Sequence, residues 1–409
     1  MITSVTVNGV ALDLEGIEYR VTVSHGRNDI TSNPQASDAS MTLFGFASIP
    51  IEIADTVVIN ANGAARFTGR VSDLTLRHDY NPNGDYVARL DCTIMGTLAE
   101  LGLMYVGAAG YAKELLDVRV ENILTETGLA YANNSDPLMT QESLDALDGG
   151  YSAIDLLNAL GTETGGTLCD LPDGNVLWES YSRRGYGYNP AHWSDMGLDT
   201  WADVDYVWAD VYDRVTTAPQ TVDLPHEAVV WSPTWSNTNQ TILNDVTVIY
   251  GSAGTSMESG TEPDSITTYG RRATSLTTQL HAKADAETRV ADILRAQSEP
   301  RYALQNIQVI VDELTEPTLT NVLDLISGSR VSIQNTPQPS PIEDYTGVVE
   351  GWTEYFTPGQ DILSISLSDP RFSYATCRWN EVSEVLTWGD VIPTVQWYNV
   401  VLPDDLLVA

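Results

Sequence analysis

The chain has 409 residues, and its 20 lysines and arginines stand against 56 aspartates and glutamates, giving a formal net charge of -36. A chain of this length is expected to form about two to four domains with a proper hydrophobic core. Hydrophobic residues make up 43% and charged residues 19%, which is typical of a globular protein. The acidity excludes a protein whose main attraction is to nucleic acid or to an anionic membrane surface.

The cysteines and the amino end narrow the class further. Cys92, Cys169 and Cys377 are far apart and odd in number, which excludes a disulfide framework and a CxxC metal site. Residues 1–9 have no basic flank or apolar block, so they predict a strand and not a signal peptide. No stretch approaches the roughly 18 to 20 apolar residues of a membrane helix, so no membrane segment is predicted. We expect a soluble protein that is synthesised in the cytoplasm.

The first hundred residues alternate between apolar and polar side chains, the pattern of half-buried strands. Asn8-Gly9 predicts a tight hairpin, because this dipeptide supplies the positive φ that primed turns require. Many short strands at this spacing are typical of an antiparallel sandwich or barrel. The expected strands are 5–7, 10–12, 17–23, 39–43, 51–53, 57–59, 67–76 and 86–94, with a second hairpin turn at 81–85.

An α+β module is predicted to follow. Val120, Ile123, Leu124 and Thr127 form the apolar stripe of an amphipathic helix that Gly128 ends. A second helix is expected to start at Ser152, with Asp155 three residues later as in a capping box, and to end at Gly161. A hairpin is expected after it, with strands 167–170 and 176–179 around Pro172-Asp173-Gly174-Asn175.

The second half of the chain returns to strand patterns, with one clear helix at 282–297 that Pro300 stops. A polar flexible loop is expected at 252–263. The expected strands are 229–235, 245–250, 307–311, 330–333, 345–355 and 362–367. The predicted divisions are a first tube-like β-barrel at 1–105, an inserted α+β domain at 106–182, a long decorated connection at 183–226, a second tube-like β-barrel at 227–370 and a Trp-containing arm at 371–409.

Two distant stretches resemble each other. One contains Phe67-Thr68-Gly69-Arg70-Val71 and the other Tyr345-Thr346-Gly347-Val348-Val349. Each follows a short apolar strand (54–59 or 327–333) and continues into a strand, a turn with Pro and Gly, and a return strand. The glycine suits a bulge or a close backbone crossing. The pattern favours a duplicated β unit over coincidence. Three such chains around an axis would then present six similar barrels.

These motifs, the insert hairpin after Gly165-Gly166 and the helix after Tyr269-Gly270-Arg271-Arg272 together resemble the phage tail hub proteins over roughly residues 1–370. The resemblance implies a mainly β fold of two duplicated tube-type antiparallel β-barrels with an inserted α+β module. It implies a homotrimer at the tail tip of a virion, closing the tail tube and forming part of the DNA ejection channel.

The implied partners of such a hub are the distal tail protein and tail tube protein above, and a fibre, spike or tape-measure protein below. Genomic DNA would pass through without specific binding. The chain shows no long carboxy-terminal fibre or peptidase extension, which leaves open whether it is the main hub or a sister ring component. A distal tail ring protein is the alternative within the structural class, although it would carry one barrel and form hexamers. The net charge predicts acidic channel walls that repel phosphates.

The sequence favours no enzyme, cofactor or metal site. Nucleophile elbows, phosphate loops, GxGxxG before a helix and calcium loops are absent. The five histidines form no HxxxH or HExxH motif, and a single histidine near acids is usually a surface residue. These histidines are His25, His78, His192, His226 and His281.

One segment suggests a different class, a carbohydrate-binding surface or virion protein. Aromatic and acidic residues alternate between Trp193 and Trp208, a mixture able to stack on sugar rings and, with paired carboxylates, to hydrolyse a glycosidic bond. We prefer the simpler interpretation that these aromatics anchor a long loop, because no strand or helix fixes the acids at a catalytic separation. The residues concerned are Trp193, Trp201, Tyr206 and Trp208 with Asp195, Asp199, Asp203 and Asp205.

Overall fold

The computed structural model describes a mainly β protein, which confirms the predicted class. It describes residues 2–179 and 221–369, apart from short gaps within both ranges. The gaps are 14–17, 30–31, 47, 62, 81–85, 135–142, 226–227, 231–234, 237–240, 252–253, 301, 305, 335, 337–338, 343–344 and 358–359. Most of the predicted connection 183–226 and the whole arm 371–409 lie outside the described residues.

The amino-terminal strands form a first β unit with the order β3-β4-β7-β6-β5-β1-β2. The predicted hairpin is present, with φ of 50° at Asn8 and 78° at Gly9 between its strands. The strand predicted at 51–53 is wrong. Ile51 is buried, but Ala54 turns the chain with a φ of 69° before the next strand starts. The strands are β1 (Ile2–Val7), β2 (Val10–Ala11), β3 (Glu18–Gly26), β4 (Asp38–Phe44), β5 (Thr56–Ala61), β6 (Ala64–Tyr80) and β7 (Tyr86–Met95).

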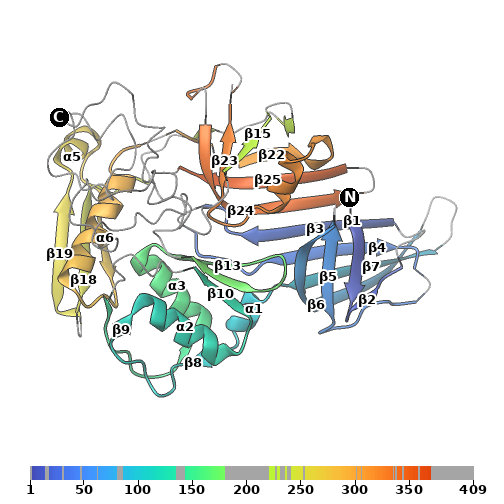
Figure 1. The fold of residues 1–409 in the computed structure, drawn as a ribbon, viewed down its shortest axis with the longest axis horizontal. Helices are drawn as coiled ribbons and strands as arrows, with labels where there is room; N and C mark the ends of the chain where they lie inside the picture. Colours follow the sequence, from blue (N-terminus) through green and yellow to red (C-terminus); the bar gives the residue numbers. More distant parts are fainter. Residues whose placement is uncertain are drawn as a thin grey trace, which may run out of the picture.

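The carboxy-proximal strands form a second β unit with the order β16-β22-β25-β24-β23-β15. β24 pairs with β3 in antiparallel fashion, so strands of both units lie side by side in one 13-stranded sheet (Figure 1). Two short helices, η6 (Val311–Glu313) and α7 (Thr318–Leu323), lie between its strands in sequence. The strands are β15 (Thr221–Leu224), β16 (Val229–Val230), β22 (Asn306–Ile310), β23 (Arg330–Ile333), β24 (Tyr345–Thr357) and β25 (Gln360–Ser368), with the short pair β17 (Trp235–Ser236) and β21 (Ala303–Leu304) beside them.

The predicted α+β insert is present between the units. Helix α2 (Leu116–Thr127) ends at Gly128, which has the left-handed conformation expected of a helix stop. Helix α3 (Ala153–Thr164) starts after Ser152 as predicted, but it continues through Gly161 and ends at Gly165, so the predicted end is wrong. Gly161 serves packing instead, because a Cβ there would lie 2.9 Å from the Gly166 carbonyl oxygen.

The predicted hairpin of the insert is formed by β13 (Thr167–Asp170) and β14 (Val176–Glu179). β10 (Tyr131–Asn134) adds to its edge in parallel. The remaining elements of the insert are α1 (Leu98–Leu101), β8 (Tyr105–Val106), β9 (Glu114–Leu115), β11 (Ser143–Leu144) and β12 (Tyr151–Ser152).

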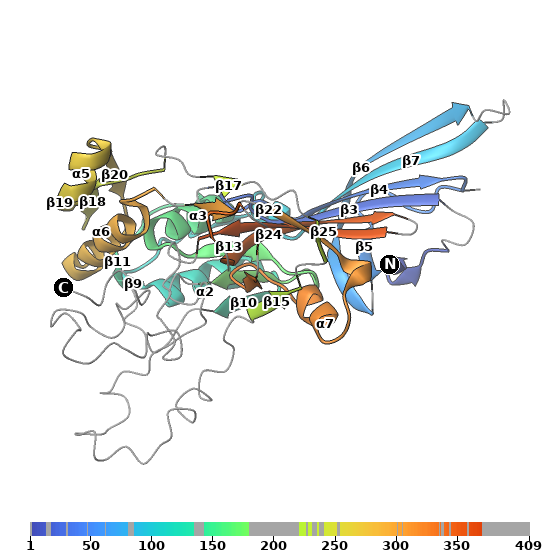
Figure 2. The ribbon, with the colours of Figure 1, turned by 90° about the horizontal axis from the view of Figure 1, so that it is seen from above.

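A small three-stranded sheet and one long helix extend the insert on the side away from β1 (Figure 1, yellow; Figure 2). The flexible loop predicted at 252–263 is wrong for its described part, because β19 occupies most of it. The strand is stabilised by pairing with β18 and by contact with α6, which approaches closely over Gly260; a Cβ there would lie 2.6 Å from Val290 Cγ1. The elements are β18 (Asp245–Tyr250), β19 (Ser256–Thr261), α5 (Pro263–Tyr269), β20 (Ala273–Thr277) and α6 (Lys283–Gln297).

The buried apolar residues form three cores. Each β unit has its own core, and a third core joins the insert to the β18–α6 region, where Val248 and Ile293 share a cluster with Leu157 and Trp178. Residues 245–297 therefore pack with the insert, although they lie within the predicted second β unit. Phe356 of β24 belongs to the core of the first unit, so the two units also share apolar contacts.

A buried carboxyl lies where the insert meets the chain leading to α6. Glu163 of α3 accepts hydrogen bonds from the Gln279 backbone N (2.7 Å) and side-chain Nε2 (3.3 Å). Burial raises the pKa of Glu163 to about 7, because desolvation of the charged form outweighs these hydrogen bonds and the nearby arginines.

This shift predicts a pH-dependent contribution to stability. Since the folded-state pKa exceeds the unfolded value, Glu163 stabilises the fold below pH 4.5 and loses that contribution as pH rises through 7. The loss is expected to be about 3 kcal/mol between these limits. Glu163→Gln removes the titration, so the difference in free energy of unfolding between variant and wild type should change by that amount between pH 4.5 and 8 in urea titrations. A difference that stays constant with pH would contradict this assignment.

Candidate functional site

The two β units are built alike. The order β3-β4-β7-β6-β5-β1 in the first matches β16-β22-β25-β24-β23-β15 in the second, strand for strand. Gly69 lies opposite Val57 and Gly347 opposite Val331, as the sequence repeat predicts. A bulge interrupts the pairing at the same place in both, between 71 and 73 in β6 and between 349 and 351 in β24. The units also differ: β1 pairs with β5 antiparallel, whereas β15 pairs with β23 parallel, and β2 has no counterpart among the described strands of the second unit.

Each β unit also contains a contact between the aromatic residue before its Thr-Gly and a second ring. The Phe67 ring of the first unit lies 5.9 Å from the His25 ring, and the Tyr345 ring of the second lies 5.3 Å from that of Trp235. The first pair joins β6, which carries the first Thr-Gly, to β3. The second pair joins β24, which carries the second Thr-Gly, to β17. Duplication of an ancestral unit stays a prediction, which the shared order, bulge and aromatic pair support.

The joint between the units is the antiparallel pairing of β24 with β3, from Gly351 opposite Gly26 to Phe356 opposite Val21. The backbones approach closely at the first pair. A Cβ on Gly351 would lie 2.4 Å from the His25 carbonyl oxygen, and a Cβ on Gly26 would lie 2.4 Å from the Glu350 carbonyl oxygen. Gly26 also has a φ of 74°, which favours glycine. The joint thus depends on two glycines that face each other.

Buried charges cross the joint. Arg66 Nη2 lies 2.6 Å from Glu354 Oε1, and Arg66 Nε donates to the other carboxylate oxygen at 3.0 Å. Trp352 Nε1 also donates to Glu354 Oε1. Both members of the ion pair are almost fully buried, so each is the counter-ion of the other in a site that water does not reach. A second ion pair joins Arg27 Nε to Glu350 Oε2 at 2.8 Å.

His25 is a core residue of this joint. Its ring stacks on Trp352 at 4.7 Å, with Nδ1 2.8 Å from Ser37 Oγ and Nε2 2.8 Å from the Arg66 carbonyl oxygen. Burial lowers the pKa of His25 to about 4, so the ring is neutral near pH 7. The expectation of a surface histidine is therefore wrong at this position.

The open face of the sheet is polar and rich in hydroxyl groups. Val21, Val23 and Met41 point to the core, and the residues between them point to the opposite face. In register across six strands the alternation places on this face Gln308, Ser364, Thr353, Ser24, Thr22, Ser40, Thr42 and Thr93, of which Ser364 is buried and the others are exposed or half-buried. Its charges are of both signs, with Glu18, Asp38, Asp73, Asp79 and Asp91 among Arg20, Arg70, Arg77 and Arg89. Arg89 lies 2.9 Å from Asp91, so part of this charge is paired.

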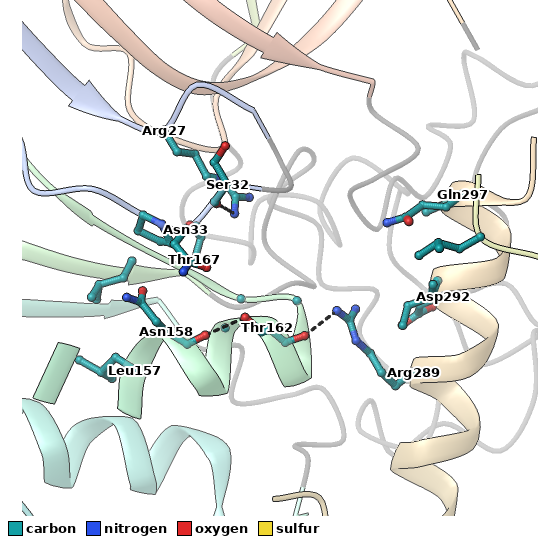
Figure 3. A pocket seen from close by; sticks show the side chains of 18 residues that line it. Arg27, Ser32, Asn33, Leu157, Asn158, Thr162, Thr167, Arg289, Asp292 and Gln297 are labelled. Carbon is teal, nitrogen blue, oxygen red and sulfur yellow. Dashed lines mark hydrogen bonds between the residues drawn. The ribbon is translucent and has the colours of Figure 1, made fainter. Parts of the chain in front are cut away.

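A pocket of about 290 Å³ lies where the chain between β3 and β4 faces α3 and α6 (Figure 3). The Thr162 hydroxyl donates to the Asn158 carbonyl oxygen. Arg289 Nη2 in turn donates to the Thr162 carbonyl oxygen at 2.9 Å. Arg27 on the opposite wall is paired with Glu350. These contacts hold neighbouring elements together and place no nucleophile beside a general base.

The other residues considered for chemistry are not brought together. His78 lies on β6, and His281 Nδ1 lies 2.6 Å from Asp145 Oδ1. Within the described residues no group of three His, Cys, Asp or Glu is arranged to hold a metal ion. His192, His226 and the Trp193–Trp208 segment, including its four aspartates, lie outside the described residues. No helix among the described residues has the length and apolarity needed to cross a membrane.

The chain is similar in structure to tail proteins, one of them from a prophage. The 43 kDa tail protein of prophage MuSo2 from Shewanella oneidensis superposes with a TM-score of 0.59 over 91% of this chain and 99% of its own, at 11% identity. A tail protein from Neisseria meningitidis MC58 gives 0.58 over 90% and 98%, at 12% identity. No family model and no curated protein matches the sequence. At this identity the likeness establishes a shared fold over nearly the whole chain.

The joint was missed by sequence reasoning. Trp352, Glu354 and Phe356 are every second residue of β24, so their side chains lie on the same face of the strand. Two of them are large aromatic residues, which indicates that the Glu354 carboxylate lies on a buried face. A buried carboxylate requires a cationic partner, so the pattern itself predicts one. Nothing in the sequence shows that the partner is Arg66, which lies 288 residues away.

Proposed function

We propose that the chain is a structural subunit of a phage tail, namely a hub that closes the distal end of the tail tube. The observation that carries the proposal is one sheet built from two like β units, in a fold shared with tail proteins. Two units in one chain let three chains present six similar units around an axis, so a trimer matches a six-membered tube. No catalytic role is assigned.

The partners follow from this position. The distal tail protein and tail tube would contact one end of the ring, and a fibre, spike or tape-measure protein the other. DNA would pass through the centre without specific binding. The one-barrel distal tail ring protein is disfavoured, because this chain carries two units of the same strand order.

The open face of the sheet is the surface that we place toward the channel. Its hydroxyl and amide side chains and its charges of both signs make the described part of this face far less acidic than the whole chain. With this face toward the channel, we infer a polar wall close to neutral, where the net charge alone predicts an acidic one. A neutral polar wall binds phosphates weakly, because it offers no cluster of cations to release counterions from DNA. The excess of acidic residues then serves solubility and lies elsewhere on the chain.

The proposal is tested by imaging tailed particles that carry an epitope tag on this chain. A single antibody spot at the end of the tail is expected in each particle. Label spread along the tube, or on the capsid, would contradict the assignment to the distal end. Digestion of peptidoglycan or soluble glycans by the purified protein would contradict the non-catalytic role.

A further inference from the structure

We propose that the pocket between the chain after β3, α3 and α6 binds an extended peptide segment of another protein, uncharged and with an aliphatic side chain. Its walls come from parts of the chain that are distant in sequence: residues 27 and 32–34, residues 157–168 around the end of α3, and residues 289–297 of α6 (Figure 3). Its volume of about 290 Å³ is near the lower limit for small-ligand pockets, so it suits a single side chain with its flanking peptide units and not a folded element. The site does not depend on the position of the chain in a tail.

A side-chain amide lies on each wall of the pocket. Asn158 projects from α3 toward the chain that carries Asn33, and Gln297 extends from α6 toward the same chain (Figure 3). Asn158 Oδ1 is buried and accepts no hydrogen bond from the described residues. An unpaired buried acceptor is unfavourable, and an N–H group of a ligand would satisfy it. The pocket therefore offers a hydrogen bond that a peptide N–H can complete.

The charged groups that line the pocket have partners within the chain. Arg27 Nε lies 2.8 Å from Glu350 Oε2, and Asp292 Oδ1 lies 3.2 Å from Arg295 Nη2. Arg289 Nη2 donates to a backbone carbonyl oxygen of α3 at 2.9 Å. A charged ligand would have to break one of these contacts or enter the pocket without a counter-ion, and both are costly in a partly buried site. The pocket therefore favours a ligand without net charge.

The lining favours a peptide over a sugar as the uncharged ligand. A side-chain amide carries the same kinds of donor and acceptor as a peptide unit, so Asn158 and Gln297 can each form two hydrogen bonds with a peptide backbone. Leu157 and Ile293 add an apolar part that suits an aliphatic side chain. Sugar sites generally use an aromatic ring for stacking, and the described residues that line this pocket include no aromatic ring.

The proposal is tested with N-acetyl-leucine N-methylamide, an uncharged probe that has a peptide unit on each side of one aliphatic side chain. Its binding to the full-length chain is measured by titration calorimetry and by saturation-transfer NMR, with methyl glucoside as the sugar probe. We expect a dissociation constant on the order of 1 mM for the peptide probe, as for a good ligand of this size. Methyl glucoside should show no saturable binding at the concentrations that saturate the peptide probe. Binding of methyl glucoside alone, or of neither probe, would overturn the proposal.

Two variants locate the binding in this pocket. Asn158→Leu should weaken binding of the peptide probe about tenfold, because it removes a hydrogen-bonding amide at similar side-chain volume. The thermal midpoint of this variant should equal or exceed that of the wild type, since the oxygen that is removed accepts no hydrogen bond from the described residues. Gln297→Leu should also weaken binding, and it tests the α6 wall independently.

Asn122→Leu on α2 is the matched control, because Asn122 is an exposed helical asparagine that does not line the pocket. This variant should bind the probe as tightly as the wild type. Unchanged binding in both pocket variants, or equal weakening in the control, would overturn the assignment of the site.

Discussion

Replacing Arg66 with methionine is expected to lower the free energy of unfolding by about 3–5 kcal/mol, because Glu354 is then left charged and unpaired in a buried site. Arg66 lies on β6 of the first unit and Glu354 on β24 of the second, so the substitution weakens the contact between the two units. Urea titration at pH 7, followed by tryptophan fluorescence, measures the change, since Trp352 contacts the carboxylate.

Two further variants separate the ion pair from general effects of substitution. Arg66→Met combined with Glu354→Leu removes both charges and should regain most of the lost stability, because a buried pair contributes little net energy over apolar residues of similar size. Arg70→Met is the surface control, since Arg70 is 63% exposed and its ion pair with Glu100 should contribute less than about 1 kcal/mol. A loss below 1 kcal/mol for Arg66→Met alone would show that the pair does not hold the units together.

Gly351→Ala is expected to destabilise the protein by about 3 kcal/mol, at the upper end of the range for overpacking. The added Cβ would meet the His25 carbonyl oxygen at 2.4 Å and the Arg27 backbone nitrogen at 2.7 Å. These neighbours are backbone atoms, so relief requires the strands of the joint to separate. Gly102→Ala is the matched control, because its nearest neighbour would lie 3.5 Å away. Equal thermal midpoints for the two variants would contradict the close crossing.

Local patterns predicted much of the fold. The Thr-Gly repeat located two strands whose neighbours and bulges coincide, since the glycine and the aromatic residue at the core are constraints within a few residues. The bulge itself starts two residues after the glycine in both strands. Gly128 was predicted correctly as a helix end, whereas Gly161 was not. Both glycines follow an apolar stripe, and only the packing of Gly161 against Gly166 distinguishes them.

The remainder depends on contacts far apart in the sequence. β19 is polar except for Met257 and Gly260, and it becomes a strand because β18 pairs with it and α6 covers Gly260. The pairing of β24 with β3 joins residues more than 300 positions apart, and alternation within either strand is the same with or without that partner. The ion pair at the joint likewise depends on a contact between residues far apart in the sequence. Glu354 could be recognised as a buried carboxylate, but its partner Arg66 is identified only when the strands are in place.

The most direct test of the central claim is electron cryo-microscopy of the tail tip, reconstructed with threefold symmetry. The two β units of each chain should alternate around the channel at nearly equal spacing, with β24 against β3 inside each chain. A density in which the first and second units lie at different heights or radii, or in which a single unit per chain lines the channel, would contradict it.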